Sequence, residues 1–138
     1  MLKKRIIFTL LYCDGFFVQS RNFNLQRVGD INWLKKNYDL KNISNYIDEL
    51  IVLNVSRGNK NFDDFIINLK ILSKNFFTPL TAGGGINSFE NAKKLFFNGA
   101  DKVLINSAIF KNDIILNQIA DVYGEQSIVG GIDLKKEN

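Results

Sequence analysis

The sequence predicts an α/β fold in which helices cover a parallel sheet. Short apolar runs of strand length alternate with longer segments in which apolar residues recur at helical spacing. The order is strand then helix, four times over, and then one more strand. Such strict alternation is typical of parallel strands joined by crossover helices.

The first unit begins with a nearly continuous apolar run over residues 5–11, which we interpret as a buried strand. An Asp-Gly pair at 14–15 follows it and favours a turn. Residues 15–23 are interpreted as a small hairpin-like excursion. Asp30 is the expected N-cap of a helix over residues 31–40.

The second and third units repeat this order. A second buried strand is expected over residues 49–55, before a helix over 61–73 that has its large apolar residues on one face. A third, short strand is expected over 77–83. It leads into a helix over 88–98, with Ser88 as the N-cap.

The last elements are a strand over 101–105, a helix over 112–123 and a fifth strand over 127–133. Gly99 and Gly124 each fit the position directly after a helix, where a residue without a side chain is favoured. The element order is therefore complete for four strand–helix units and one further strand.

Two architectures fit this order, a doubly wound open sheet and a (β/α)8 barrel. Four units in about 125 residues give roughly 30 residues per unit, the spacing of a barrel of about 250 residues. No G-x-G-x-x-G follows the first strand, which disfavours a dinucleotide-binding sheet. We therefore interpret residues 1–138 as one incomplete (β/α)8 barrel domain, a half-barrel over 1–126 plus a fifth strand over 127–133.

Composition restricts the function classes. The net charge is +4 without a long basic run, so nucleic acid is not an expected partner, and no segment approaches the roughly 18 apolar residues of a membrane span. The single cysteine, Cys13, has no ligand cluster around it, which indicates a reduced, cytoplasmic setting with no metal or cofactor. Because the chain has no histidine, acid–base chemistry would fall to carboxylates, Lys, Tyr or Cys.

Polar and glycine residues follow the third and fourth strands at the edge where parallel α/β folds bind ligands. Gly83, Gly84 and Gly85 would let a phosphate approach the backbone, and Asn106 and Ser107 would add donors from the next strand. The same glycines would also suit a tight turn with close helix packing. The Asn-Ser pair favours the phosphate interpretation.

Asp133 ends the predicted fifth strand. A carboxylate there would serve as a catalytic acid or base, or equally as a helix cap or a surface residue. Cys13 has no cationic partner in view and is interpreted as structural.

Several segments together resemble a known family. "MLKKRII" followed by "DG", then "DELIVLNV", "GGGI", "GADKVLINSA" and "IADVYGEQSIVGGID", are similar to the cyclase subunit of imidazole glycerol phosphate synthase, in order from residue 1 to about 135. The resemblance implies a lyase of histidine biosynthesis with a (β/α)8 barrel of two similar halves, each with a phosphate site. A glutaminase partner would deliver ammonia, which the cyclase joins to a phosphoribosyl-formimino-carboxamide ribotide.

Individual residues follow from this resemblance. Gly85, Asn106 and Ser107 match the phosphate site of the first half, with Ser in place of the usual Thr. Asp133 matches one of the two catalytic aspartates, whereas Leu11 occupies the position of the other. Whether the chain is an active enzyme is therefore open.

Two further replacements point to a second role. Gln19 stands where the family has Lys, and Asn54 where it has Asp. "TLL..DG" together with "RVGD" resembles a paralogous branch that works with a glutaminase-like partner in amidating sugars of surface glycans such as lipopolysaccharide. The substrate would be a phosphorylated ribotide in the first case and a sugar in the second. Because the second half-barrel is expected to be missing, the chain would pair with another half-barrel or self-associate.

Overall fold

The computed structural model describes residues 3–58, 61–111 and 113–134. Seven strands form one sheet in the order β3-β2-β1-β4-β5-β6-β7. The strands are β1 (Ile7–Cys13), β2 (Phe16–Arg21), β3 (Asn24–Gly29), β4 (Glu49–Asn54), β5 (Leu80–Gly83), β6 (Lys102–Ile105) and β7 (Ile128–Gly130).

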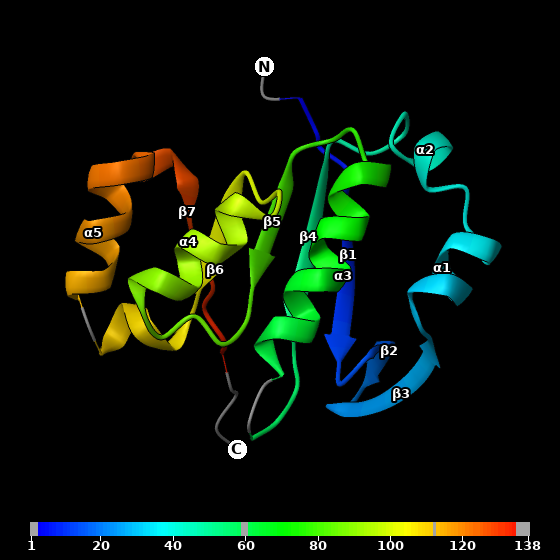
Figure 1. The fold of residues 1–138 in the computed structure, drawn as a ribbon, viewed down its shortest axis with the longest axis horizontal. Helices are drawn as coiled ribbons and strands as arrows, with labels where there is room; N and C mark the ends of the chain where they lie inside the picture. Colours follow the sequence, from blue (N-terminus) through cyan, green and yellow to red (C-terminus); the bar gives the residue numbers. More distant parts are fainter. Residues whose placement is uncertain (1–2, 59–60, 112, 135–138) are drawn as a thin grey trace.

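The helices connect the strands (Figure 1). They are α1 (Ile31–Asn37), α2 (Leu40–Ile43), α3 (Phe62–Asn75), α4 (Phe89–Phe97) and α5 (Asp113–Tyr123), with short 3-10 helices η1 (Ser107–Phe110) and η2 (Glu125–Ser127). None of the described helices has the length and apolar content needed to cross a bilayer.

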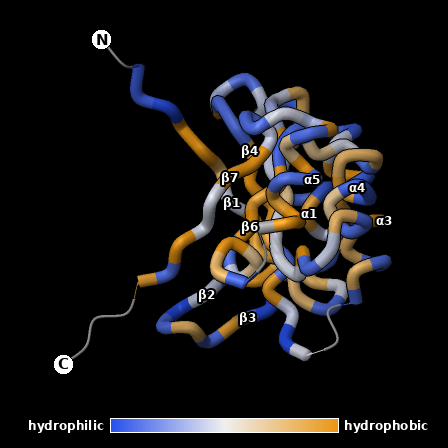
Figure 2. Tube along the Cα trace, turned by 90° about the vertical axis from the view of Figure 1, so that its left-hand side faces the viewer, coloured by the Kyte–Doolittle hydropathy of each residue, from blue (hydrophilic) through white to orange (hydrophobic). Residues whose placement is uncertain are grey.

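Five strands, β1, β4, β5, β6 and β7, pair in parallel in chain order. Each of the first four is followed by helical structure before the next begins. In Figure 2 the helices α1, α3, α4 and α5 gather on one side of the strands. The predicted four strand–helix units and fifth strand are confirmed, and the architecture is that of a partial (β/α)8 barrel.

The excursion after the first strand is larger than predicted. β2 and β3 form an antiparallel hairpin, and β2 pairs with the last three residues of β1. The hairpin turns at Asn22 and Phe23, which both have positive φ (50° and 62°), as the tight twist of a two-residue hairpin turn requires. β2 therefore covers the carboxyl end of β1, which is not an open edge of the sheet there.

Several predicted boundaries shift for local reasons. The helix expected over 31–40 is two helices, because Tyr38 is extended and the Asp39 side chain caps α2 by accepting from the Asn42 N–H. The strand expected over 77–83 is confined to β5. Asp101, expected in a strand, lies before β6.

The last predicted elements are also shorter. The fifth strand, expected over 127–133, is confined to β7 and ends at Gly130. The helix expected over 112–123 is confirmed as α5, although Asn112 itself lies outside the described residues. Asp30 and Ser88 cap α1 and α4 as predicted, each accepting a backbone N–H from three residues on.

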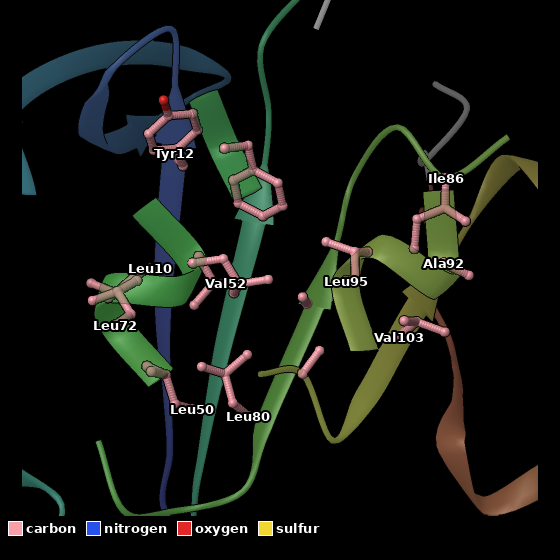
Figure 3. Packing of buried hydrophobic residues seen from close by; sticks show 14 of the residues in the cluster. Leu10, Tyr12, Leu50, Val52, Leu72, Leu80, Ile86, Ala92, Leu95 and Val103 are labelled. Carbon is pink, nitrogen blue, oxygen red and sulfur yellow. The ribbon is translucent and has the colours of Figure 1, made fainter. Parts of the chain in front are cut away.

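The core lies between the sheet and its helices, as Figure 3 shows around β1, β4, β5, α3 and α4. Alternate residues of each strand point to the helices, so Leu50, Val52 and Ala82 are fully buried there. On α3, Phe65 and Leu69 meet them, which confirms the predicted apolar face of that helix. Burial of each large side chain contributes about 1.5–3 kcal/mol.

Among the described residues, no helix labelled in Figure 2 lies over the other face of the sheet. Residues opposite each other in neighbouring strands point to the same side. One such row runs across all five parallel strands, and four of its five members are half-buried aliphatic side chains. It consists of Leu11, Leu53, Gly83, Leu104 and Val129.

An ionic cluster occupies the opposite, amino-terminal end of this face. Glu49, only 5% exposed, accepts a hydrogen bond from the Thr81 hydroxyl at 2.6 Å. Arg5 and Lys102 form ion pairs with its two carboxylate oxygens at 2.9 and 3.4 Å. Burial by itself raises the pKa of Glu49, but the Thr81 hydroxyl and the two cations outweigh it and hold that pKa below its ordinary value.

The depressed pKa of Glu49 predicts a pH-dependent contribution to stability. Because the folded-state pKa lies below the unfolded one, near 4.5, this contribution is complete above that pH and is lost as the pH falls through the folded value. We expect Glu49→Gln to lower the unfolding free energy by about 1–3 kcal/mol at pH 7. The difference from the parent should shrink toward pH 3 in thermal melts. Glu90→Gln, on the exposed start of α4, is the control, and a gap that stays constant with pH would contradict the assignment.

The uncovered face predicts that the 138-residue chain, expressed alone, self-associates. Light scattering should give a mass above the 15.8 kDa of one chain, rising with concentration. Ile51→Gln, on the uncovered face, should reduce association, since it removes apolar surface that association would bury. Ile67→Gln, on the exposed side of α3, should not. A concentration-independent monomer would refute this prediction.

Candidate functional site

A cavity in the described part of the chain lies at the carboxyl ends of β4, β5 and β6. It has a volume of about 730 Å³. Of the six residues predicted from sequence, the following five line it: Gly84, Gly85, Asn106, Ser107 and Asp133. The edge of the sheet where ligands were expected is therefore where the cavity lies.

The three glycines have different roles in the fold. Gly83 is the buried last residue of β5, where a Cβ would come within 2.8 Å of the Leu104 carbonyl oxygen. Gly84 has φ +94°, and a Cβ there would come within 2.1 Å of the Asn54 carbonyl oxygen. Gly85 has φ +78°. Turn geometry and close packing thus account for Gly83 and Gly84, while the backbone of Gly84 and Gly85 borders the cavity.

Helix α4 begins directly beyond this loop. Ser88 accepts a hydrogen bond from the Asn91 N–H at 3.2 Å. The Asn91 side-chain amide donates to the Gly85 carbonyl at 3.2 Å and to Asn87 Oδ1 at 2.9 Å. The loop and the first turn of the helix are therefore joined by both the main chain and a side chain.

Two predicted site residues contact each other directly. Asn106 precedes η1 but its side chain does not cap it. The Asn106 amide donates instead to Asp133 Oδ2 at 2.6 Å. Asp133 is exposed and stands three residues beyond the end of β7, so the expectation that it terminates the strand is wrong. The hydrogen bond brings it to the cavity nonetheless.

The opposite wall is fixed by a chain of hydrogen bonds around the end of β4. Asn54 Oδ1 accepts from the Ser56 N–H at 3.1 Å, and the Ser56 hydroxyl accepts from the Asp14 N–H at 3.0 Å. Asp14 has φ +46° in the turn predicted for it. Burial and the Asp14 carboxylate raise the pKa of the Cys13 thiol, which keeps it protonated at neutral pH and fits its structural interpretation.

A buried hydroxyl joins this turn to α3. The Tyr12 hydroxyl contacts the Asp64 carboxylate closely and accepts from the Gly15 N–H at 3.1 Å. The Asn68 side-chain amide donates to the same hydroxyl at 3.4 Å. The Tyr12 side chain is fully buried, so the bonds satisfy a polar atom inside the core. They also connect the turn before β2 to α3.

The electrostatic character of the cavity is set by amides. Asp133 is the one charged side chain among the described residues that line it. Four asparagines line it as well, namely Asn54, Asn87, Asn91 and Asn106. Leu11, for which the resemblance predicts the position of a second aspartate, lies in the apolar row of the uncovered face. The geometry can therefore accept hydrogen-bonding anions on one side and offers one carboxylate on the other.

Sequence reasoning missed Asn87, Asn91 and Phe62 as lining residues. Asn91 stands three residues after the N-cap Ser88, a spacing that returns a side chain to the start of the helix. That spacing was the available signal for Asn91. Phe62 belongs to the apolar face that the sequence predicts for α3, and it contacts both the core and the cavity.

Parallel strand–helix units with a polar cavity at their carboxyl ends define part of a (β/α)8 barrel of the ligand-binding kind. A family model described as "Histidine biosynthesis protein" matches residues 5–138, and the chain belongs to that family.

Individual relatives agree with this assignment. The chain is 53% identical over 138 residues to a protein of Parasynechococcus marenigrum named "Putative imidazole glycerol phosphate synthase subunit hisF2". It is 39% identical over 137 residues to an imidazole glycerol phosphate synthase subunit HisF of Chlorobium phaeovibrioides, and 37% identical to that of Dictyoglomus thermophilum. These alignments cover 99–100% of this chain but 51–53% of the relatives, so the chain spans about half their length.

The packing of Gly84 gives a prediction for stability. Gly84→Ala should destabilise the fold by more than the roughly 1–2 kcal/mol that a side chain at positive φ costs, because the new Cβ would also overlap the Asn54 backbone. Gly58→Ala is a matched control, since Gly58 has φ +74° with no atom within 4 Å of its Cβ position. Urea unfolding should show the larger loss for Gly84→Ala. Equal losses would mean that the loop moves away from β4 without cost.

Proposed function

We propose that this chain supplies the first half of a cyclase-type barrel that acts on a phosphorylated ribotide with ammonia from a glutaminase partner. The proposal rests on one observation: the residues predicted to bind phosphate and the predicted acid–base residue line the same cavity. The glycine loop and Ser107 border it from β5 and β6, and Asp133 reaches it through Asn106. The names of the relatives, which describe subunits of imidazole glycerol phosphate synthase, support the same reaction.

The phosphate would bind to main-chain N–H groups. Gly84 and Gly85 leave the backbone bare at one wall, and Ser107 provides a hydroxyl at the next. The rest of the wall is neutral in the described residues, so short hydrogen bonds would hold the phosphate rather than a lysine or arginine.

Asp133 would act as the acid or base of the reaction. The Asn106 amide occupies its Oδ2, which directs the remaining oxygen, Oδ1, to a substrate proton. In the reaction the carboxylate would accept a proton from the incoming nitrogen and return it to the leaving fragment. The products would be imidazole glycerol phosphate and an aminoimidazole carboxamide ribotide.

A second candidate is a non-cyclase paralogue that partners a glutaminase in amidating surface-glycan sugars. Leu11 favours it, because an aliphatic side chain in an apolar row cannot transfer a proton. Gln19, exposed on β2, lacks the charge of the family lysine. The higher identity to the hisF2 relative than to the HisF relatives, 53% against 37–39%, supports a branch apart from the ordinary cyclase subunits.

Complementation separates the two candidates. The complete gene encoding this chain, expressed with a glutaminase subunit, should restore growth of a histidine auxotroph that lacks the cyclase. Asp133→Asn should remove this growth, since an acid–base group contributes about 10²–10⁴-fold to rate. Asp121→Asn, an exposed carboxylate on α5, is the control and should grow. Soluble protein that fails to complement would favour glycan amidation, and growth with Asp133→Asn would contradict its catalytic role.

A further inference from the structure

We propose that Asn91 is a positioning residue that holds the Gly85–Ile86 peptide with its N–H facing the cavity. The inference rests on the phosphate cradle proposed above and assigns Asn91 a role through its contact with the glycine loop. Its side-chain amide bonds the Gly85 carbonyl at 3.2 Å and Asn87 Oδ1 at 2.9 Å. Asn91 thereby connects both sides of Ile86 to α4.

Peptide geometry gives this contact a direction. In a planar trans peptide the carbonyl and the following N–H point in opposite directions, and the described residues contain no cis peptide bond. With the Gly85 oxygen turned to Asn91, the Ile86 N–H turns the other way. Ile86 is 8% exposed, its side chain packs in the core near Ala92 (Figure 3), and the residue lines the cavity.

The loop needs such a restraint because of its glycines. Gly84 and Gly85 both have positive φ, and glycine crosses readily between conformations that reverse a neighbouring peptide. Packing against the Asn54 backbone fixes Gly84. Asn91 restrains the next peptide through its hydrogen bond to the Gly85 carbonyl. Losing it would leave the Ile86 N–H free to turn away from a bound phosphate.

The chemistry of Asn91 is specific to this task. Asn91 is the third residue of α4, a position where a negatively charged side chain would stabilise the helix by interacting with the positive end of its dipole. An acidic side chain could not donate to the Gly85 carbonyl, however. Asparagine is the same size and keeps the donor, so the sequence gives up a favourable helix charge to retain this hydrogen bond.

The chain offers a matched control on the same helix. The Asn98 side-chain amide donates to the Lys94 carbonyl at 2.8 Å, at the opposite end of α4. Asn91→Ala and Asn98→Ala each remove one amide-to-carbonyl hydrogen bond. Only the first alters the loop that borders the cavity.

The experiment measures binding of inorganic phosphate by the purified chain, from the rise in melting temperature with phosphate concentration and from amide shifts of residues 84–87. We expect Asn91→Ala to weaken the apparent Kd about five- to tenfold, the worth of one or two oriented hydrogen bonds. Asn98→Ala should bind as the parent does. Asn91→Asp should also bind weakly while its phosphate-free melting temperature is equal to or above that of the parent, an outcome that a purely structural role does not produce.

The outcomes distinguish the role of Asn91 from the proposed phosphate site on which it rests. If the parent chain shows neither a melting shift nor amide shifts with phosphate, the cradle itself is refuted. If the parent binds and both Asn91 variants bind equally well, the cradle stands and the role of Asn91 is overturned. Equal weakening by Asn91→Ala and Asn98→Ala would likewise overturn it, because general loss of helix stability would then be the cause. Asn91→Asp supplies the test if the alanine variant does not fold.

Discussion

The structure depends on the placement of α1, α3, α4 and α5 on one face of the sheet that the five parallel strands form. This constraint divides each strand into residues that enter the core and residues that face the uncovered side. It also brings the carboxyl ends of β4, β5 and β6 to one edge. Tyr12 and Leu11, neighbours in β1, consequently belong to different environments, a fully buried hydroxyl network and an open apolar row. The position of a residue along its strand determines how close it lies to the cavity. Because alternate residues point to opposite sides, its place in that alternation determines which face of the sheet it joins.

The glycine loop and the carboxylate of the cavity are held in place in different ways. Its glycine loop is held by β4 on one side and α4 on the other, through backbone contact at Gly84 and side-chain contact at Asn91. The single carboxylate, Asp133, lies outside any regular element and is located by Asn106. The glycine wall is thus built into the packing of the fold, whereas the position of the carboxylate depends on one hydrogen bond.

Sequence reasoning succeeded where local chemistry decides structure. The caps Asp30 and Ser88 follow from side chains that satisfy nearby N–H groups, and the strand–helix order follows from apolar spacing. It placed the hairpin but underestimated its length, because residues 16–21 pass from buried apolar to exposed polar side chains instead of alternating. It also missed the Asn106–Asp133 contact, which joins residues 27 apart and requires the fold to bring them together. The bond from Asn91 to Gly85 depends on two positive φ angles that glycine permits but does not dictate.

The asparagine-rich lining has a consequence for the conditions under which the cavity would work. Amide groups do not titrate, so most of the polar wall keeps the same hydrogen-bonding character from acidic to alkaline solution. Contacts made by neutral donors at short range are also screened little by dissolved salt, unlike those of lysine or arginine. Any sensitivity of binding by this amide wall to acidity would then come from the ligand's own phosphate. The affinity would then change with the ionisation of the ligand, while the hydrogen-bonding groups of the amide wall stay nearly the same.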